Sequence, residues 1–259
     1  MDQVRAGLAS CVLQLKLRFS PIRLGLNLIE SVPVTITYTW LAIESNNSDL
    51  LTHILVGAPM IAVWATMSLQ LGYLLDSEIW NQTLVFVLIS RTSLPVVMLG
   101  RMLGEVIMHI PTAILSVSIV LILAPQIPSI ASPGFFVLSI IVAGISLVST
   151  TLILSPFVVM VRGRAGFMAI FILAGIVLSG FVYPIDRLPM AFQVVSRVLP
   201  TSWAMSSVWE SVGGVSPWSS IALNWATSLL MSAAYLVSSY LLFKVIRKRI
   251  TVSGTLGEA

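Results

Sequence analysis

Long apolar runs alternate with short polar connectors along most of this chain. A bilayer core about 30 Å thick is crossed by a helix of about 20 apolar residues. Six runs reach or approach that length with few charged side chains inside them. Backbone groups in lipid must pair within their own segment, which favours helices, and the strict alternation of a membrane strand is missing. The six predicted spans cover residues 24–43, 51–75, 94–123, 134–161, 165–182 and 219–243.

The first 20 residues mix apolar and polar positions along one predicted helix. Apolar side chains recur at helical spacing, while Arg5, Gln14 and Lys16 fall between them. This pattern predicts an amphipathic helix over residues 1–20 that lies at the membrane interface, and packing on a partner's surface is a compatible alternative. The dipeptide Ser20-Pro21 is expected to end this helix. The apolar positions are Val4, Leu8, Cys11, Val12, Leu15 and Phe19.

A polar stretch over residues 76–93 separates the second and third spans. It carries charge of both signs, so we expect a helix that lies outside the membrane. It lies between two spans and is the longest polar segment between spans on the inner side of the predicted topology. The residues expected to contact a partner there are Asp76, Glu78, Trp80, Thr83 and Arg91.

Residues 183–213 form a segment that is too long and too apolar for an ordinary loop. Three prolines should each interrupt a helix, which predicts short re-entrant or interface-lying helices on the outer side. Irregular backbone at membrane depth is tolerated where it lines a cavity or is covered by protein, so this is a candidate outer gate. A surface cap anchored by tryptophan is the alternative. The candidate gate residues are Tyr183, Pro184, Leu188, Pro189, Pro200 and Trp203.

Composition and charge agree with a membrane protein. Of the 259 residues, 57% are hydrophobic and 9% charged, and the mean hydropathy is +1.00, which excludes a soluble domain. Twelve of the 14 Lys and Arg residues fall on one side of the predicted topology, and only Arg187 and Arg197 on the other. Cytoplasmic loops retain positive charge, so both termini are predicted to be cytoplasmic at the inner membrane. The positive balance indicates contact with anionic lipid rather than nucleic acid.

One polar row lies inside the predicted third span. Arg101, Glu105 and His109 are spaced four apart and therefore share one helical face. The row is either a proton or substrate relay or a hydrogen-bonded row facing the bundle, and we favour the latter. Gly100 and Gly104 form a small-residue pair that permits close approach of another helix.

The chain shows no set of residues typical of an enzyme. It has no Gly-x-x-x-x-Gly-Lys-[Ser/Thr] loop, so it cannot be its own ATP-driven motor. Its two histidines lack a cysteine or carboxylate cluster at metal spacing, so we expect no metal, cofactor or catalytic site. Cys11 has no nearby base and is interpreted as a packing residue. An ion-coupled carrier is less favoured, because its second interrupted region is missing.

The residues from Ser179 to Ile185 read Ser-Gly-Phe-Val-Tyr-Pro-Ile, and Leu188-Pro189 and Leu199-Pro200 follow. Together with Leu99-Gly100-Arg101 at the third span, they resemble the membrane subunit of ABC transporters of the ABC-2 permease type. The resemblance covers nearly the whole chain as a single domain. It departs from the family at residues 82–85, where Gln-Thr-Leu-Val replaces Gly-Thr-Leu-Glu.

The resemblance implies a mechanical function. Two separate ATP-binding subunits would hold ATP and Mg²⁺, dock on residues 76–93 as a coupling helix, and drive alternating access between two permease chains, identical or related. The expected cargo is an amphipathic drug-like or lipid-like molecule moved out of the cell, as in multidrug or antibiotic efflux. Export of a polysaccharide or lipid-linked glycan by the same family is the alternative.

Overall fold

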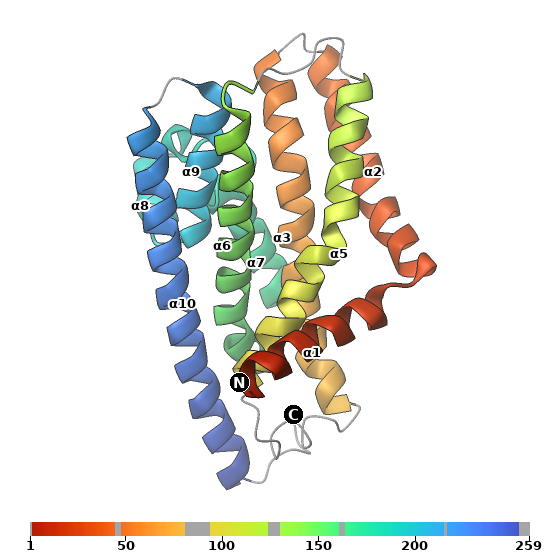
Figure 1. The fold of residues 1–259 in the computed structure, drawn as a ribbon, viewed down its shortest axis with the longest axis vertical. Helices are drawn as coiled ribbons and strands as arrows, with labels where there is room; N and C mark the ends of the chain where they lie inside the picture. The colour runs from red at the N-terminus through yellow and green to blue at the C-terminus, as the bar shows by residue number, and fades with distance from the viewer. Residues whose placement is uncertain are drawn as a thin grey trace.

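The protein is all-helical in the residues that its computed structural model describes, which are 2–44, 48–80, 94–123, 130–160, 164–214 and 217–253. The long helices run along one direction as a bundle, and the N-terminal helix crosses its lower end (Figure 1). Within this part of the chain there are nine α-helices and one short 3₁₀ helix. They are α1 (Asp2–Arg18), α2 (Pro21–Glu44), α3 (Ser48–Trp80), α5 (Leu94–Leu123), α6 (Pro133–Met160), α7 (Arg164–Leu178), η1 (Ile185–Arg187), α8 (Met190–Ser196), α9 (Pro200–Gly213) and α10 (Trp218–Ser253).

Four of the described helices are long and apolar enough to cross a membrane. The qualifying stretches are Leu51–Leu69 in α3, Val96–Leu123 in α5, Pro133–Leu154 in α6 and Trp218–Val245 in α10. Helices α2 and α7 occupy the positions of the other two predicted spans, but α7 has only 15 residues. The multi-pass membrane architecture is therefore confirmed, whereas the number of six spans stays a prediction.

Helix boundaries agree with the sequence pattern at some places and differ at others. α1 ends at Arg18 and α2 begins at Pro21, which confirms the predicted break. α7 ends at Leu178 rather than at 182, because Gly180 turns the chain with a φ of 74°, a conformation that glycine adopts at little cost. α3 continues to Trp80, so the start of the predicted coupling helix is continuous with the second span.

Helix α10 is longer than its predicted span. Its 36 residues correspond to about 54 Å of helix, well beyond an apolar core of about 30 Å. The excess lies after the predicted end at residue 243 and includes Lys244 and Arg247. α10 is therefore longer than a bilayer core requires, and its extra turns lie at its C-terminal end.

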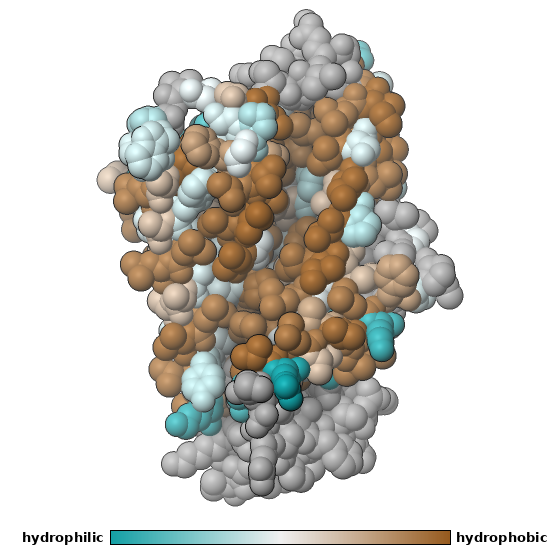
Figure 2. Space-filling view, in the orientation of Figure 1, coloured by the Kyte–Doolittle hydropathy of each residue, from teal (hydrophilic) through white to brown (hydrophobic). Residues whose placement is uncertain are grey.

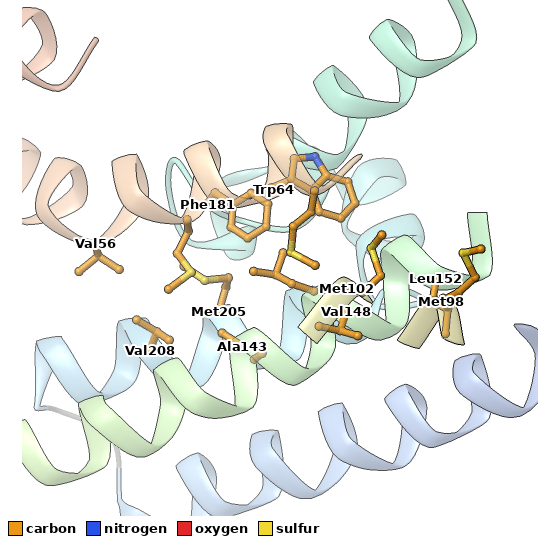
Figure 3. Close-up of a cluster of buried hydrophobic side chains, with 14 of the residues drawn as sticks. Val56, Trp64, Met98, Met102, Ala143, Val148, Leu152, Phe181, Met205 and Val208 are labelled. Atoms are coloured by element: carbon orange, nitrogen blue, oxygen red, sulfur yellow. The ribbon is translucent and has the colours of Figure 1, made fainter. Parts of the chain in front are cut away.

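The core forms where α3, α5, α6 and α9 meet the chain just after α7 (Figure 3). Trp64 of α3 lies at its centre with no exposed surface and packs against Phe181, with ring centroids 5.9 Å apart. The Trp64 Nε1–H donates to the carbonyl oxygen of Ile172 at 3.1 Å, which links α3 to α7. Methionines such as Met102 and Met205 fill the remaining gaps. This core fixes the chain reversal after α7 against the centre of α3.

Apolar side chains also cover the outside of the bundle. Figure 2 shows hydrophobic residues over most of the visible middle of the molecule. Large exposed hydrophobic side chains occur on every long helix from α5 onward, for example Ile114, Ile141 and Leu230. Monomeric soluble proteins rarely expose such continuous apolar surface, whereas lipid tails provide a matching solvent.

Candidate functional site

Three prolines within residues 183–213 mark where the helices of this segment begin. Pro184 precedes η1 as its N-cap and Pro189 precedes α8 in the same way, while Pro200 is the first residue of α9. Proline is favoured at a helix start, since its fixed φ suits the first turn and its missing N–H leaves no donor unpaired. The prolines thus lie at the starts of short helices, while the re-entrant or interface-lying placement of these helices stays a prediction.

The segment between α7 and α10 folds back along the bundle. The backbone N–H of Ala131 and that of Ser132 donate to the carbonyls of Val212 and Ser211, at 3.3 and 3.1 Å. α9 therefore ends beside the start of α6. At the other end of α9, the Ser228 hydroxyl donates to the carbonyl of Pro200 at 2.9 Å. Ser228 lies ten residues into α10, so α9 begins about 15 Å along that helix.

Helix α9 is also connected to the chain just after α7. The hydroxyls of Ser179 and Thr201 lie 2.8 Å apart, and both side chains are buried. The Trp209 indole N–H donates to the carbonyl of Gly180 at 2.8 Å. The Trp209 ring also stacks on His53 of α3, with centroids 4.6 Å apart. These contacts make α9 a bridge between α3 and the reversal after α7.

A carboxylate joins the C-terminal part of α9 to the start of α10. Oε1 of Glu210 accepts hydrogen bonds from the Ser220 hydroxyl and from the Asn224 amide, each at 3.0 Å. Glu210 is not among the predicted site residues, because nothing in a one-dimensional pattern pairs it with residues ten and fourteen positions later. An acidic residue within an apolar, proline-bounded segment was the available signal.

The candidate gate residues differ in their surroundings. Leu188 and Pro200 are buried, Pro189 is exposed, and Tyr183 and Pro184 are partly buried. Trp203 is partly buried, and its indole N–H donates to the carbonyl of Arg197 at 2.9 Å. The structure thus places these residues in helix starts and local contacts, and their role as a gate stays a prediction.

The polar row of α5 lies inside the protein. Glu105 and His109 are each 3% exposed, while Arg101 is partly buried. The Gln14 amide of α1 donates to Oε1 of Glu105 at 2.5 Å, and Gln14 itself is 4% exposed. The periodicity of residues 1–20 predicts Gln14 on the polar face of an interfacial helix, so this contact was not predicted.

The predicted close approach at Gly100 and Gly104 is confirmed, and the neighbouring helix is α1. A Cβ at Gly100 would lie 2.2 Å from the carbonyl oxygen of Gly7, and one at Gly104 would lie 3.0 Å from that of Cys11. Any side chain at Gly100 would therefore push the two helices apart. Cys11 is a partly buried free cysteine in this contact, which fits its interpretation as a packing residue.

The candidate coupling residues lie at one end of the bundle. Asp76, Glu78 and Trp80 belong to the last turns of α3, at the end where α5 begins (Figure 1). Thr83 and Arg91 lie outside the described residues. In the described part of the chain, no group of three or more His, Cys, Asp and Glu residues is arranged to hold a metal ion.

Comparison with known families gives one match. The family model described as ABC-2 type transporter matches residues 22–212, which is more than half of the chain. The matched range begins in α2 and includes the polar stretch after α3 and nearly all of α9. No curated protein and no solved structure matches the chain.

Proposed function

Because this chain belongs to the ABC-2 type transporter family and is a membrane permease without an ATPase domain, we propose that it is the transmembrane subunit of an ATP-driven exporter. Two separate ATP-binding subunits bind ATP and Mg²⁺ in this proposal, and a second permease chain, identical or related, completes the complex. Six helices cross the inner membrane, and both termini are cytoplasmic.

The proposed mechanism converts ATP binding into movement of the permease helices. The ATPase subunits close on ATP and displace residues 76–93, and access to the pathway then switches from the inner to the outer side. A ligand can shift such an equilibrium only by its different affinity for the two states. The coupling contact is therefore expected to differ between the inward-facing and outward-facing states.

The chain connectivity supports this site of contact. α3 runs to Trp80 and α5 begins at Leu94, so the proposed contact joins two of the membrane-crossing helices. Both helices contribute to the core, through Trp64 on α3 and Met102 on α5. A displacement at this end is thereby passed to the packed centre of the bundle. The assigned contact residues are Asp76, Glu78, Trp80, Thr83 and Arg91.

The outer gate is assigned to the segment that folds back along the bundle. Its supporting observations are the helix starts at three prolines and the contact of Pro200 with Ser228, well inside α10. Re-entrant backbone of this kind is tolerated where protein or a water-filled cavity covers it. The assigned gate residues are Tyr183, Pro184, Leu188, Pro189, Pro200 and Trp203.

The proposed cargo is amphipathic and drug-like or lipid-like. Among the buried residues of the described part, Glu105 is the only Asp, Glu, Lys or Arg, and hydroxyl groups make up most of the other buried polar groups. An interior of this kind offers apolar contact and a few hydrogen bonds, which suits an amphiphile better than a small ion or a free sugar.

The observation that carries the proposal is the family match, and the coupling contact is its most testable part. The double substitution Trp80→Ala with Glu78→Lys removes an apolar anchor and reverses a charge. It should lower the ATPase activity that the assembled complex shows in response to cargo, while the membrane level of the permease stays unchanged. The matched control is Trp218→Ala, an exposed tryptophan at the opposite end. Normal cargo-stimulated activity in the double variant would overturn the coupling assignment.

A further inference from the structure

Helix α1 contacts α5 through its backbone as well as its side chains. An added Cβ at Gly100 would collide with the carbonyl of Gly7, and at Gly104 it would touch the carbonyl of Cys11. A Cβ on Gly7 would in turn lie 3.3 Å from Cγ1 of Val96. Glycines on both helices thus allow backbone atoms of one helix to lie against the other at these positions.

The order of these contacts limits how the two helices can move. Residue numbers increase together on both sides, from Gly7 against Val96 and Gly100 to Cys11 against Gly104. The two helices therefore advance in the same direction along their contact, as they do where α1 passes over the lower part of α5 (Figure 1). Sliding of α1 would bring a residue with a side chain to the place of a glycine, and closely packed interfaces resist that.

A buried hydrogen bond also joins α1 to α5 next to these glycines. The Gln14 amide N–H donates to the Glu105 carboxylate, and both side chains are almost fully buried. A buried polar group that loses its hydrogen-bond partner destabilises the arrangement, and more strongly when the group is charged. Separating α1 from α5 would leave the carboxylate without this donor. The hydrogen bond therefore adds directional specificity to the close approach of the two helices.

The rest of α1 is largely exposed and carries both apolar and charged side chains. Val4 and Leu8 are exposed on one flank of the face that holds Gln14, and Leu17 is exposed on the other flank. Arg5 and Lys16 are exposed on the side opposite Gln14. Apolar flanks beside a charged outer face suit a helix at the surface of the bilayer, where the flanks meet lipid and the charged side chains meet water.

We propose that the Gln14–Glu105 hydrogen bond fixes α1 to the inner half of α5, so that the two helices move as one rigid unit when the ATP-binding subunits close on ATP. The proposal rests on the proposed function, because α5 begins directly after the segment assigned to the ATPase contact. Gln14 and Glu105 are positioning residues in this arrangement. α1 is then a moving part of the coupling machinery that slides over the bilayer surface, rather than a fixed anchor.

Distances between spin labels test whether α1 and α5 move together, and this test does not require the cargo to be known. In a Cys11→Ser background, pairs of exposed positions are labelled in the full complex: Lys16 with Ile107, and Lys16 with Leu241. Vanadate is used to trap the ATPase subunits. The Lys16 to Ile107 distance should stay unchanged on trapping, while the Lys16 to Leu241 distance should shift. A change in the first distance, or no shift in the second, would overturn the proposal.

A swap of the two side chains tests the hydrogen bond itself. Gln14→Glu places two carboxylates together and should broaden the Lys16 to Ile107 distances, whereas Gln14→Glu with Glu105→Gln restores an amide–carboxylate pair and should narrow them again. If Gln14→Glu does not accumulate, Gln14→Met, which removes the donor at similar length, should broaden them as well. An unchanged distribution in the single variant, or no recovery in the double variant, contradicts the assignment. Failure of the complex to assemble with an ATPase subunit would instead count against the proposed function.

Discussion

At the scale of single residues, glycines decide how closely helices pack, because glycine has no side chain. Gly175 of α7 faces Trp64, and a Cβ there would lie 2.1 Å from the indole ring. Gly100 of α5 has the carbonyl of Gly7 at nearly the same distance. Both positions accept only glycine without movement of a neighbour, so the two glycines set the spacing of α7 and α1 against the bundle.

Gly100→Ala should therefore destabilise the protein. Overpacking of a well-packed contact costs about 1–3 kcal/mol, which corresponds to a fall of about 5 °C in the melting temperature of the detergent-solubilised protein. Gly144→Ala on α6 is the matched control, because a Cβ there meets nothing within 4 Å. Its melting temperature should stay equal or rise slightly, since alanine is the better helix former. Equal losses in the two variants would contradict the close approach of α1.

The sequence pattern identified positions that make close or polar contacts more reliably than it identified the residues that they contact. The small-residue spacing of Gly100 and Gly104 indicated a close helix contact, and the structure supplies α1 as the neighbour. Helical periodicity assigned Gln14 to a polar face, and the structure buries it against Glu105. Periodicity describes one helix at a time, so it cannot state which polar group will be covered by another helix.

At the scale of elements, the segment between α7 and α10 is organised by the starts of its helices and by polar contacts along α9. Proline positions were readable from the sequence and give the starts of η1, α8 and α9. The early end of α7 was not readable, because an apolar run continues past Leu178 while the backbone turns at Gly180. A hydropathy pattern indicates which residues avoid water, but it does not indicate the backbone conformation at which a helix ends.

Glu210→Ala should loosen the contact between α9 and α10. The substitution leaves the donors of Ser220 and Asn224 without their acceptor, at a cost of about 1–3 kcal/mol. Hydrogen exchange of the last turns of α9 should become faster, as measured by mass spectrometry on the solubilised protein. Glu210→Gln keeps an oxygen acceptor and should show a smaller effect. If both variants exchange like the unchanged protein, Glu210 does not hold the two helices together.

At the scale of the whole molecule, composition and long apolar runs were enough to establish a helical membrane protein. Four helices meet the requirements for crossing a membrane, and the family match identifies a permease of an ABC transporter. The arrangement of α1 over the lower end of the bundle depends on tertiary contacts and could not be read from the sequence. Those contacts place α1, the start of α5 and the proposed ATPase contact at one end of the molecule.

The central claim is that ATP hydrolysis in a separate subunit drives this permease. It is tested most directly by translocation of a fluorescent phospholipid in liposomes that contain the permease and its ATP-binding subunits. Translocation should require ATP, should stop when the ATPase is inactivated by mutation, and should continue after proton and sodium gradients are collapsed. Translocation by the permease alone under an ion gradient, without the ATPase subunits, would contradict the account.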